Sequence, residues 1–328
     1  MLKRISRRAM CSASFIPLMM LGGVSMAQAQ GAFPSRTISL IVPFTPGSTS
    51  DIAARLVAQK IAGPLGQTVV VENRPGANGQ LAMQAVARAA PDGHTLVVGS
   101  VSATVVPTVL QKTVPFDILK DFAPVSVIAG TTLVLLAAKD APYNSVAELV
   151  ATAKRAPGTL NYANSAGLYR VAMEALNLQA GIDLNAIAYK GPAEAANDLL
   201  GGRLSVAPDS LGSATRLIQA GRTKALAVLS GHRSPALPEV PTMQELGYKD
   251  FDFNGWISIL APAGTPPAVA QRLHEEIAKA VASDDVRQQY IKVALDPVTM
   301  GPKEYRELLE REIAKYQRIG REAKIEKL

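Results

Sequence analysis

The sequence predicts an α/β protein built from two domains, and two observations lead to this fold class. Short runs rich in β-branched residues alternate with segments of helical periodicity, which is typical of α/β architecture with mostly parallel strands. Two such sets of units follow one another, and the chain then runs back toward the first. Two crossing segments of this kind form a hinge, and the space between hinged domains is a common ligand site.

The first set of units is predicted in residues 30–130 and repeats the order strand, loop, helix. Gly/Pro-rich loops separate each strand from the next helix, as expected where a buried strand feeds a covering helix. The expected elements are, in order, a strand at 37–42, a helix from Asp51 onward, a strand at 68–72, a helix at 79–90 and a strand at 95–100.

The second domain is predicted at 131–254. Apolar runs at 125–128 and 133–138 are long enough to pass from one sheet to the next, and the run at 256–260 is expected to lead back. Residues 255–328 then rejoin the first domain through C-terminal helices. Within the second domain we expect helices at 145–155, 170–180 and 193–200, and strands at 160–163, 187–189, 204–207 and 225–229.

Residues 1–29 have the pattern of a cleaved signal peptide. A basic head precedes an apolar run, and Ala27-Gln28-Ala29 matches the small-x-small cleavage pattern. Cleavage near Ala29 predicts a periplasmic protein. A membrane anchor is the competing interpretation, which Pro17 and the following Gly-Gly pair disfavour because they interrupt an already short run. The Arg7-Arg8 pair leaves both the general secretory and the twin-arginine export routes open.

Removal of this leader changes the charge and the cysteine count. Its four basic residues account for four of the seven net positive charges, so +3 remains, and neither a nucleic-acid nor a membrane-surface role is indicated. The only cysteine, Cys11, lies in the leader. The mature chain therefore has neither a disulfide nor a thiol nucleophile.

The motifs of common enzyme classes are missing from the sequence. His94, His232 and His274 have no zinc-ligand spacing, and neither a G-x-S-x-G elbow nor a G-x-x-x-x-G-K-[ST] loop occurs. We therefore predict no catalytic residue, no metal and no cofactor. Acid/base catalysis by carboxylates stays open, because paired acids can meet only in three dimensions.

The loop that ends at Asp51 is the most informative segment. Gly47 lets the backbone approach a ligand closely, and Ser48, Thr49 and Ser50 place hydroxyl groups beside free N–H groups at a predicted helix start. Such a helix start attracts anions, because its unpaired N–H groups and positive end both favour negative charge. An N-cap cluster without a ligand is the alternative interpretation.

A loop at 161–167 repeats this arrangement in the second domain. Two such loops, one per domain, could hold the opposite ends of a dicarboxylate or an amino acid. Arg170, about one turn into the next helix, could form a bidentate pair with a carboxylate. A solvated arginine on the helix surface is the alternative.

Further candidates follow other strands or could wall the cleft. Asp209 could orient a ligand ammonium or hydroxyl, or it could cap the next helix. Phe44 and Trp256 could form apolar walls or belong to the core. Loops 73–79 and 100–104 lie at the strand ends that line the ligand crevice in open α/β sheets. The predicted ligand-binding residues are Phe44, Gly47, Ser48, Thr49, Ser50, Asp51, Asn78, Ser100, Ser102, Thr104, Asn164, Ser165, Ala166, Gly167, Tyr169, Arg170, Asp209 and Trp256.

Six segments, in the same order along the chain, resemble the Bug proteins, the substrate-binding subunits of tripartite tricarboxylate transporters. The segments are 34–47 (PSRTISLIVPFTPG), 71–76 (VENRPG), 90–93 (APDG), 121–124 (DFAP), 189–191 (YKG) and 261–266 (APAGTP). The resemblance implies a type II periplasmic binding protein, or Venus flytrap, in which a two-strand hinge joins two α/β domains. It also implies that the loop from Gly47 to Asp51 holds a ligand carboxylate.

The same resemblance implies a monomeric binding protein that is not an enzyme. Its ligands would be citrate-like acids, dicarboxylates, acidic amino acids, nicotinate-like compounds or aromatic carboxylates. Its partners would be the large and small membrane subunits of a tripartite permease. Two alternatives are a ligand sensor that docks on the ectodomain of a two-component sensor kinase, and an exported hydrolase or isomerase.

Two segments depart from the family's pattern. Where the family has a Gly-Gly pair, a small residue and Thr-Asp, this chain reads Gly47-Ser48-Thr49-Ser50-Asp51. The second-domain loop is shorter than in the family, with Leu168-Tyr169-Arg170 near the place of the family's histidine. We expect Tyr169 and Arg170 to reshape the distal pocket for an aromatic carboxylate or for a second carboxylate.

Overall fold

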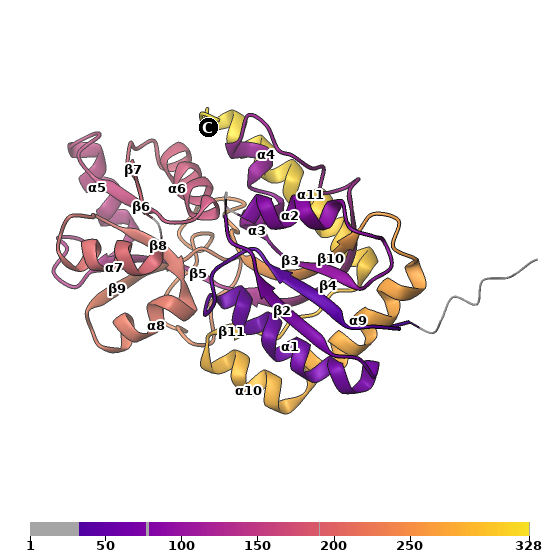
Figure 1. The fold of residues 1–328 in the computed structure, drawn as a ribbon. Coiled ribbons are helices and arrows are strands. Elements are labelled where there is room, and N and C mark those ends of the chain that lie inside the picture. Colours follow the sequence, from indigo (N-terminus) through magenta and orange to yellow (C-terminus); the bar gives the residue numbers. More distant parts are fainter. Residues whose placement is uncertain (1–32, 77–78, 190, 328) are drawn as a thin grey trace, which may run out of the picture. The chain divides into compact units, whose positions relative to one another are not determined.

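The computed structural model describes residues 33–76, 79–189 and 191–327, whose strands form three sheets (Figure 1). The predicted signal peptide lies outside the described residues. The largest sheet has six strands in the order β11-β4-β10-β3-β1-β2. These strands are β1 (Ile38–Val42), β2 (Val69–Asn73), β3 (Thr95–Ser100), β4 (Phe122–Thr131), β10 (Gly255–Pro262) and β11 (Leu295–Asp296).

Helices cover both faces of this sheet because the strand residues alternate between the faces. Ile38, Leu40 and Val42 of β1 pack in one apolar cluster with α1, α9 and α10, whereas Ile41 packs in another with α2 and α11. A strand buried on both faces is mostly apolar, and β1 is apolar except at Ser39, whose hydroxyl donates a hydrogen bond to Glu72. The helices are α1 (Thr49–Leu65), α2 (Gln80–Ala87), α9 (Pro267–Ala282), α10 (Asp284–Lys292) and α11 (Pro302–Glu322).

The directions of the strands correct the prediction of a mostly parallel sheet. β1 pairs in parallel with β2 and β3, because α1 and α2 carry the chain back between them. β10 pairs antiparallel with β3 and β4, and β11 pairs antiparallel with β4. The reason is that β4 leaves this sheet for the next one and β10 re-enters it in the opposite direction.

The other two sheets lie in the middle of the sequence. β5 (Leu133–Ala138) pairs antiparallel with β8 (Ala207–Ser210) and β9 (Thr223–Val228), so this sheet also departs from the parallel prediction. β6 (Asn161–Asn164) and β7 (Asn185–Ala188) form a two-stranded parallel sheet. Four helices accompany them: α5 (Val146–Arg155), α6 (Gly167–Ala180), α7 (Pro192–Leu200) and α8 (Leu211–Gln219).

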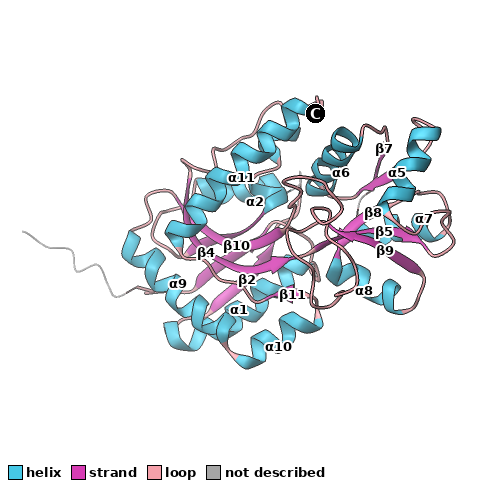
Figure 2. Ribbon diagram, turned by 180° about the vertical axis from the view of Figure 1, so that it is seen from behind, coloured by secondary structure: helices cyan, strands magenta, loops and turns pink. Residues whose placement is uncertain are grey.

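We call the six-stranded sheet with its helices the first lobe, and the elements from β5 to β9 the second lobe (Figures 1 and 2). One residue, Thr132, separates β4 from β5, and the segment 229–254 leads from β9 back to β10. Thr132 donates a hydrogen bond to Asp296 of β11 at 3.2 Å, which fixes the outgoing crossing. The chain therefore passes twice between the lobes, as predicted.

Two local predictions differ from the structure. β8 begins at Ala207, near the end of the strand expected at 204–207, so Asp209 lies inside a strand rather than after it. Residues 101–104, expected as part of a loop, form the short helix α3 (Val101–Thr104), and α4 (Pro107–Leu110) follows. Ser100 caps α3 by accepting a hydrogen bond from the N–H of Ala103.

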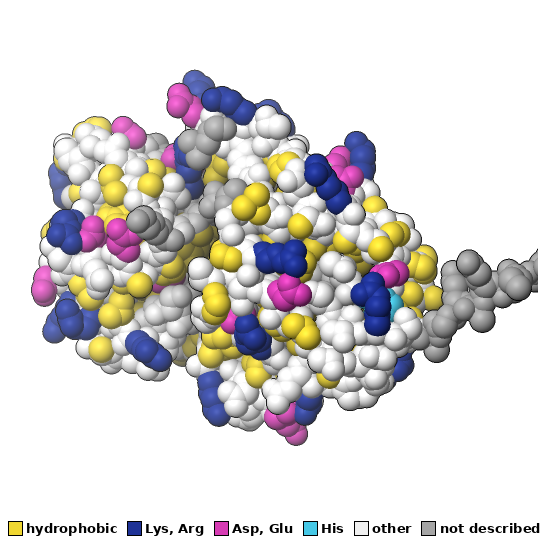
Figure 3. Space-filling view, in the orientation of Figure 1, with side chains coloured by type: hydrophobic (Ala, Val, Ile, Leu, Met, Phe, Trp, Pro, Cys, Tyr) yellow, Lys and Arg dark blue, Asp and Glu magenta, His cyan; other side chains and the backbone are white. Residues whose placement is uncertain are grey.

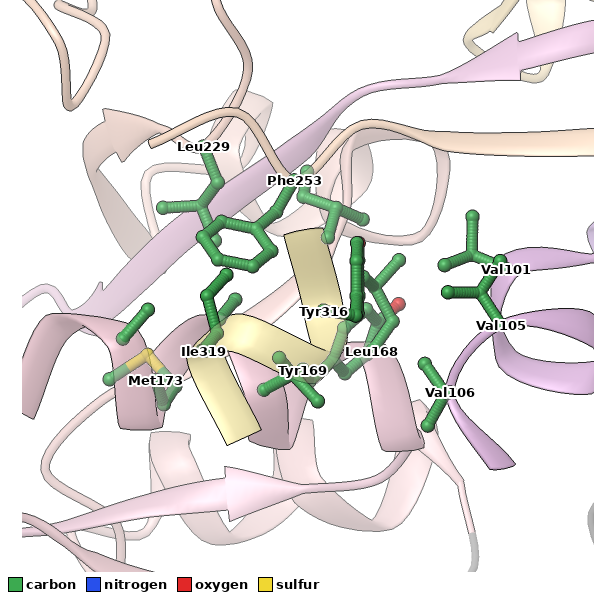
Figure 4. Packing of buried hydrophobic residues seen from close by; sticks show 14 of the residues in the cluster. Val101, Val105, Val106, Leu168, Tyr169, Met173, Leu229, Phe253, Tyr316 and Ile319 are labelled. Carbon is green, nitrogen blue, oxygen red and sulfur yellow. The ribbon is translucent and has the colours of Figure 1, made fainter. Parts of the chain in front are cut away.

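Apolar side chains connect the two lobes beside α6. Residues from α3, α4 and α11 in the first lobe pack with the first two turns of α6 and with the connecting segment (Figure 4). This packing places the start of α6 against the first lobe. The residues labelled in Figure 4 are Val101, Val105, Val106, Leu168, Tyr169, Met173, Leu229, Phe253, Tyr316 and Ile319.

Candidate ligand-binding site

A cavity of about 470 Å³ is lined by loops of both lobes. The first lobe contributes the loop after β1, the segment after β3 with α3 and α4, and the start of β10. The second lobe contributes residues 165–169 and the starts of α7 and α8. β1 and β3 both meet the cavity at their carboxyl ends, which is where ligands bind to open α/β sheets.

No Asp, Glu, Lys, Arg or His side chain of the described residues lines this cavity. Besides main-chain amides, its polar groups are hydroxyl groups, the Gln111 amide and the Trp256 indole nitrogen, and its apolar wall includes Phe44, Val106, Leu110 and the ring of Trp256. Charged side chains of both signs lie instead on the outer surface, scattered over the face in Figure 3. A charged ligand in this cavity would be held by N–H and O–H groups rather than by ion pairs.

Five helices of the described residues that are longer than two turns begin at the cavity, namely α1, α2, α6, α7 and α8. Ser48 and Ser210 cap α1 and α8, each accepting a hydrogen bond from a main-chain N–H at 3.3 Å. The caps of α6 and α7 are Ala166 and Gly191, which have no side-chain acceptor. The positive ends of helices from both lobes therefore meet at one cavity, an arrangement that favours an anion.

The carboxylate of Asp51 holds the loop after β1 in place. It accepts hydrogen bonds from the N–H of Gly47 at 2.9 Å, from Arg55 Nε at 3.0 Å and from Asn73 Nδ2 at 2.9 Å. Burial would raise the pKa of Asp51, but the hydrogen bonds from Arg55, Gly47 and Asn73 outweigh burial and lower it. Asn73 Nδ2 also donates to the carbonyl of Phe44 at 3.0 Å. This network presents Ser48 to Ser50 to the cavity.

Gly47 makes the turn of this loop possible. Its φ is 79°, in the left-handed region that only glycine adopts without strain. Neither Gly47 nor Asp51 lines the cavity, whereas Ser48, Thr49 and Ser50 do. The two residues act on the site by fixing the path of the loop.

The second-lobe wall contains a buried carboxyl group one layer behind the cavity. Asp209 is 7% exposed and accepts hydrogen bonds from the N–H of Ser210 at 2.7 Å and from the Tyr169 hydroxyl at 3.4 Å. Burial raises the pKa of Asp209 to about 7, against the opposing effect of these hydrogen bonds. The cap of α8 is Ser210 and not Asp209, so the alternative assignment of Asp209 as a helix cap is wrong.

The cavity brings together most of the predicted ligand-binding residues. Those that line it are Phe44, Ser48, Thr49, Ser50, Ser100, Ser102, Ser165, Ala166, Gly167, Tyr169 and Trp256. Asn78 lies outside the described residues. Gly47, Asp51, Thr104, Asn164, Arg170 and Asp209 are not among the residues that line the cavity.

The predicted residues away from the cavity have identifiable positions. Thr104 is buried in α3 and donates to the carbonyl of Ser100 at 2.7 Å. Asn164 ends β6, and its carbonyl accepts a hydrogen bond from the N–H of Tyr189. The Nε atom of Arg170 is buried and has no hydrogen-bond partner among the described residues.

Sequence reasoning missed part of the lining. Val106, Pro107, Leu110 and Gln111 form a wall at α4, and no local pattern distinguishes them from core residues. The starts of α7 and α8 were detectable, because a Gly-Pro pair and a Ser-x-x-Ser pattern are both signals of a helix N-terminus. Within the described residues, no group of three or more His, Cys, Asp or Glu side chains could hold a metal ion.

Comparison with known proteins agrees with this geometry. Residues 53–325 match the family described as tripartite tricarboxylate transporter family receptor. The chain belongs to this receptor family. Members of the receptor family are periplasmic solute-binding proteins, so the predicted family is confirmed. In the described parts of the chain, no helix combines the length and the apolar character needed to cross a membrane.

Three solved structures similar to this receptor also confirm the Venus flytrap fold. Rpa4515 of R. palustris, solved with adipate, is 32% identical with a TM-score of 0.82, over 90% of this chain and 100% of that chain. The periplasmic binding protein BugD is 30% identical with a TM-score of 0.79, over 90% and 100%. MatC of Rhodopseudomonas palustris, solved with bound malate, is 29% identical with a TM-score of 0.77, over 88% and 100%.

Proposed function

We propose that this receptor captures a small organic carboxylate in the periplasm for uptake by a tripartite transporter. The observation that carries the proposal is the meeting of helix starts from both lobes at a cavity where the described residues place no charged side chain. Two of the similar structures hold malate and adipate, both of which are carboxylates. A carboxylate fits such a cavity because N–H and O–H donors at positive helix ends satisfy its oxygens.

Binding of this kind needs no covalent step. Four to six charge-assisted hydrogen bonds of about 1.5–3 kcal/mol each, less the costs of desolvation and ordering, reach the roughly −8 kcal/mol of micromolar affinity. Among the residues that the structure describes, no charged acid or base lines the cavity, which supports a binding protein over an exported hydrolase or isomerase.

We assign the lobes to two domains, residues 30–130 with 255–328 and residues 131–254. The crossings at Thr132 and before Gly255 then form the hinge. Only hydrogen bonds made from both domains at once favour the closed state over the open one. The closed receptor is the form that the large and small membrane subunits of a permease would recognise.

The remaining parts of the proposal concern export and assembly. Residues 1–29 are removed as a signal peptide near Ala29, and the mature protein acts as a monomer. The chain without residues 1–29 has a net charge of +3, and its basic and acidic side chains are scattered over the face in Figure 3. This charge distribution supports a role that does not involve nucleic acid.

The loop that begins at Gly47 provides the test. Gly47→Val places a β-branched residue at a φ of 79° and should displace Ser48 to Ser50 from the cavity. We expect the wild type to bind one or more acids of a panel of malate, adipate, citrate, glutamate and benzoate in isothermal titration calorimetry. The variant should bind the same acid at least about tenfold more weakly, which corresponds to about 1.4 kcal/mol.

Gly66→Val is the matched control. Gly66 ends α1 with a φ of 66°, and both glycines have no atom within 4 Å of an added Cβ, so the two substitutions impose similar strain. Gly66 does not line the cavity, and Gly66→Val should keep the wild-type affinity. Equal affinities of the two variants would show that the loop from Gly47 to Asp51 does not bind the ligand. Conversion of the bound acid to a product, measured by NMR, would show that the protein is an enzyme rather than a binding protein.

A further inference from the structure

Asp209 is separated from the cavity by a single layer of residues. Three residues that make polar contacts with its carboxyl group, Tyr169, Ser210 and Ser213, all line the cavity. The N–H of Ser210 also donates to the Tyr169 hydroxyl at 3.1 Å, so the layer is tightly connected. A charge on Asp209 therefore lies close to any ligand that occupies the cavity.

No cation balances this carboxyl group. Its polar neighbours are Tyr169, Ser210 and Ser213, and no Lys, Arg or His of the described residues forms an ion pair or hydrogen bond with it. Asp209 lies in β8, and this strand packs against β5, β6, α6, α7 and α8. The ionisable side chains on these five elements are Tyr162, Tyr169, Arg170, Glu174, Glu194, Asp198 and Arg216.

Among those side chains, Tyr169 is the one that faces Asp209. Glu174 accepts a hydrogen bond from the Tyr162 hydroxyl at 2.8 Å, and Asp198 accepts hydrogen bonds from Tyr189 and Arg203, so both carboxylates have other partners. An anion in the cavity would therefore meet an ionised Asp209 through neutral groups alone. The protein wall has a lower dielectric constant than water. A negative charge on Asp209 and a negative charge on the ligand therefore repel each other strongly across a single layer of residues.

A small void connects the carboxyl group with the cavity wall. The void has a volume of about 10 Å³, close to the space that one water molecule needs, and Asp209, Ser165 and Pro192 all line it. Ser165 and Pro192 also line the ligand cavity. The Oγ atom of Ser165 is buried and has no hydrogen-bond partner among the described residues. Ser165 and Pro192 therefore stand between this void and the ligand cavity.

We propose that ligand capture is coupled to proton uptake by Asp209, which becomes a neutral carboxyl group when a carboxylate occupies the cavity. This inference rests on the proposed function, because it requires an anion in that cavity. Asp209 acts here as a positioning residue whose charge controls affinity without touching the ligand.

The direction of the pH dependence follows from this coupling. In the ligand-free receptor the pKa of Asp209 is about 7, and a bound anion raises it further. Below neutral pH the group is already protonated, so Asp209 no longer makes the affinity depend on pH. Above neutral pH the group is ionised in the free receptor and must take up a proton on binding, so affinity falls as pH rises.

Isothermal titration calorimetry of the full mature protein tests the proposal, with whichever acids of the panel bind. At pH 7.5 the binding enthalpy should differ between two buffers of different ionisation enthalpy, which reports proton uptake. Between pH 7 and 8.5 the Kd should rise by up to about tenfold per pH unit, and the rise should level off toward pH 6.5. In Asp209→Asn both effects should disappear, whereas in Asp198→Asn, a matched change on α7 outside the cavity, both should persist.

Tyr169→Phe provides a second variant if Asp209→Asn does not fold. Loss of the hydroxyl that donates to Asp209 raises the pKa of the carboxyl group, so the decline in affinity should begin at a higher pH. Binding without proton uptake by the wild type, or the same uptake by Asp209→Asn, would overturn the proposal and leave the proposed function intact. Failure of the wild type to bind any acid of the panel at any pH would overturn both.

Discussion

The pKa values of two aspartates beside the cavity are shifted in opposite directions, and the hydrogen-bond donors of each aspartate explain why. Asp51 accepts from the guanidinium group of Arg55 as well as from neutral donors, and its pKa is lowered. Asp209 is also buried but accepts from neutral groups alone, and its pKa is raised. The presence of a cation within hydrogen-bond distance therefore decides whether a buried carboxyl group is charged.

The sequence predicted both aspartates as candidates but could not separate their roles. The Arg55 partner lies four residues from Asp51 on one helix and was visible in the sequence, whereas Asn73 is 22 residues away. Tyr169 approaches Asp209 from 40 residues away. Which carboxyl group holds a loop in place and which supports a cavity wall depends on such distant partners, and local patterns do not contain them.

The role of Asp51 leads to a prediction about stability. Asp51→Asn keeps the shape of the side chain but removes its charge, and it should lower the free energy of unfolding at pH 7 by about 1–3 kcal/mol. Because the folded pKa is lowered, this stabilisation is present above the ordinary carboxyl pKa and is lost as pH falls through the folded value. The difference from the wild type should therefore shrink toward pH 3.

Urea unfolding at pH 7 and pH 3 measures this difference. Asp140→Asn, at an exposed turn, serves as the matched control and should leave stability within about 0.5 kcal/mol of the wild type at both values. If Asp51→Asn destabilised the protein equally at both pH values, shape rather than charge would account for its effect.

At the scale of elements, local signals located most helices and strands but not their directions. Ser145 caps α5 and Gly181 ends α6, both as their residue types suggested. All eight residues of β10 are buried, and such a run has the same pattern in a parallel or an antiparallel pair. Its antiparallel direction comes from the route of the chain through the second lobe, which no window of sequence contains.

The contact between α11 and α4 shows how tertiary packing overrides helix propensity. Gly320 lies inside α11, and an added Cβ would lie 2.5 Å from Val109 Cγ1, a separation that is too short. Alanine in a helix is more favourable than glycine by about 0.8–1 kcal/mol, but overpacking costs about 1–3 kcal/mol. The glycine is thus explained by the neighbouring helix and not by α11 itself.

A double-mutant cycle tests this explanation. Gly320→Ala should lower the free energy of unfolding in the wild-type background, because the methyl group meets Val109. In the Val109→Ala background the same change should raise it by about 0.5–1 kcal/mol, because the space is then open and only helix propensity acts. Urea unfolding of the four proteins gives both values, and the same sign in both backgrounds would refute the contact.

At the scale of the whole molecule, the cavity depends on loops that are far apart in the sequence. Ser48, Ser100, Ser165 and Ser210 all line it, although more than 150 residues separate the first from the last. The sequence predicted the two-lobed fold and the first three of these loops because each follows a predicted strand. It did not predict the wall at α4, since only the packing of α6 against the first lobe brings that wall to the site.

The contact between Gly167 of the second lobe and Val106 of the first lobe offers a direct way to test domain closure. An ideal Cβ at Gly167 of the second lobe would lie 3.7 Å from the Cβ of Val106 in the first lobe. Disulfides join Cβ atoms about 3.5–4.5 Å apart, so cysteines at these positions match the required geometry. The predicted mature chain has no other cysteine, and an introduced pair has no competing partner.

Val106→Cys with Gly167→Cys should therefore form a disulfide that ties the lobes together at the wall of the cavity. If the ligand enters only when the lobes separate, the oxidised double variant should bind a carboxylate at least about tenfold more slowly than the same protein after reduction. Stopped-flow tryptophan fluorescence, with Trp256 in the cavity wall as the reporter, measures both rates. Each single cysteine variant should be insensitive to reductant, and equal rates for the oxidised and reduced double variant would show that entry does not require the lobes to part.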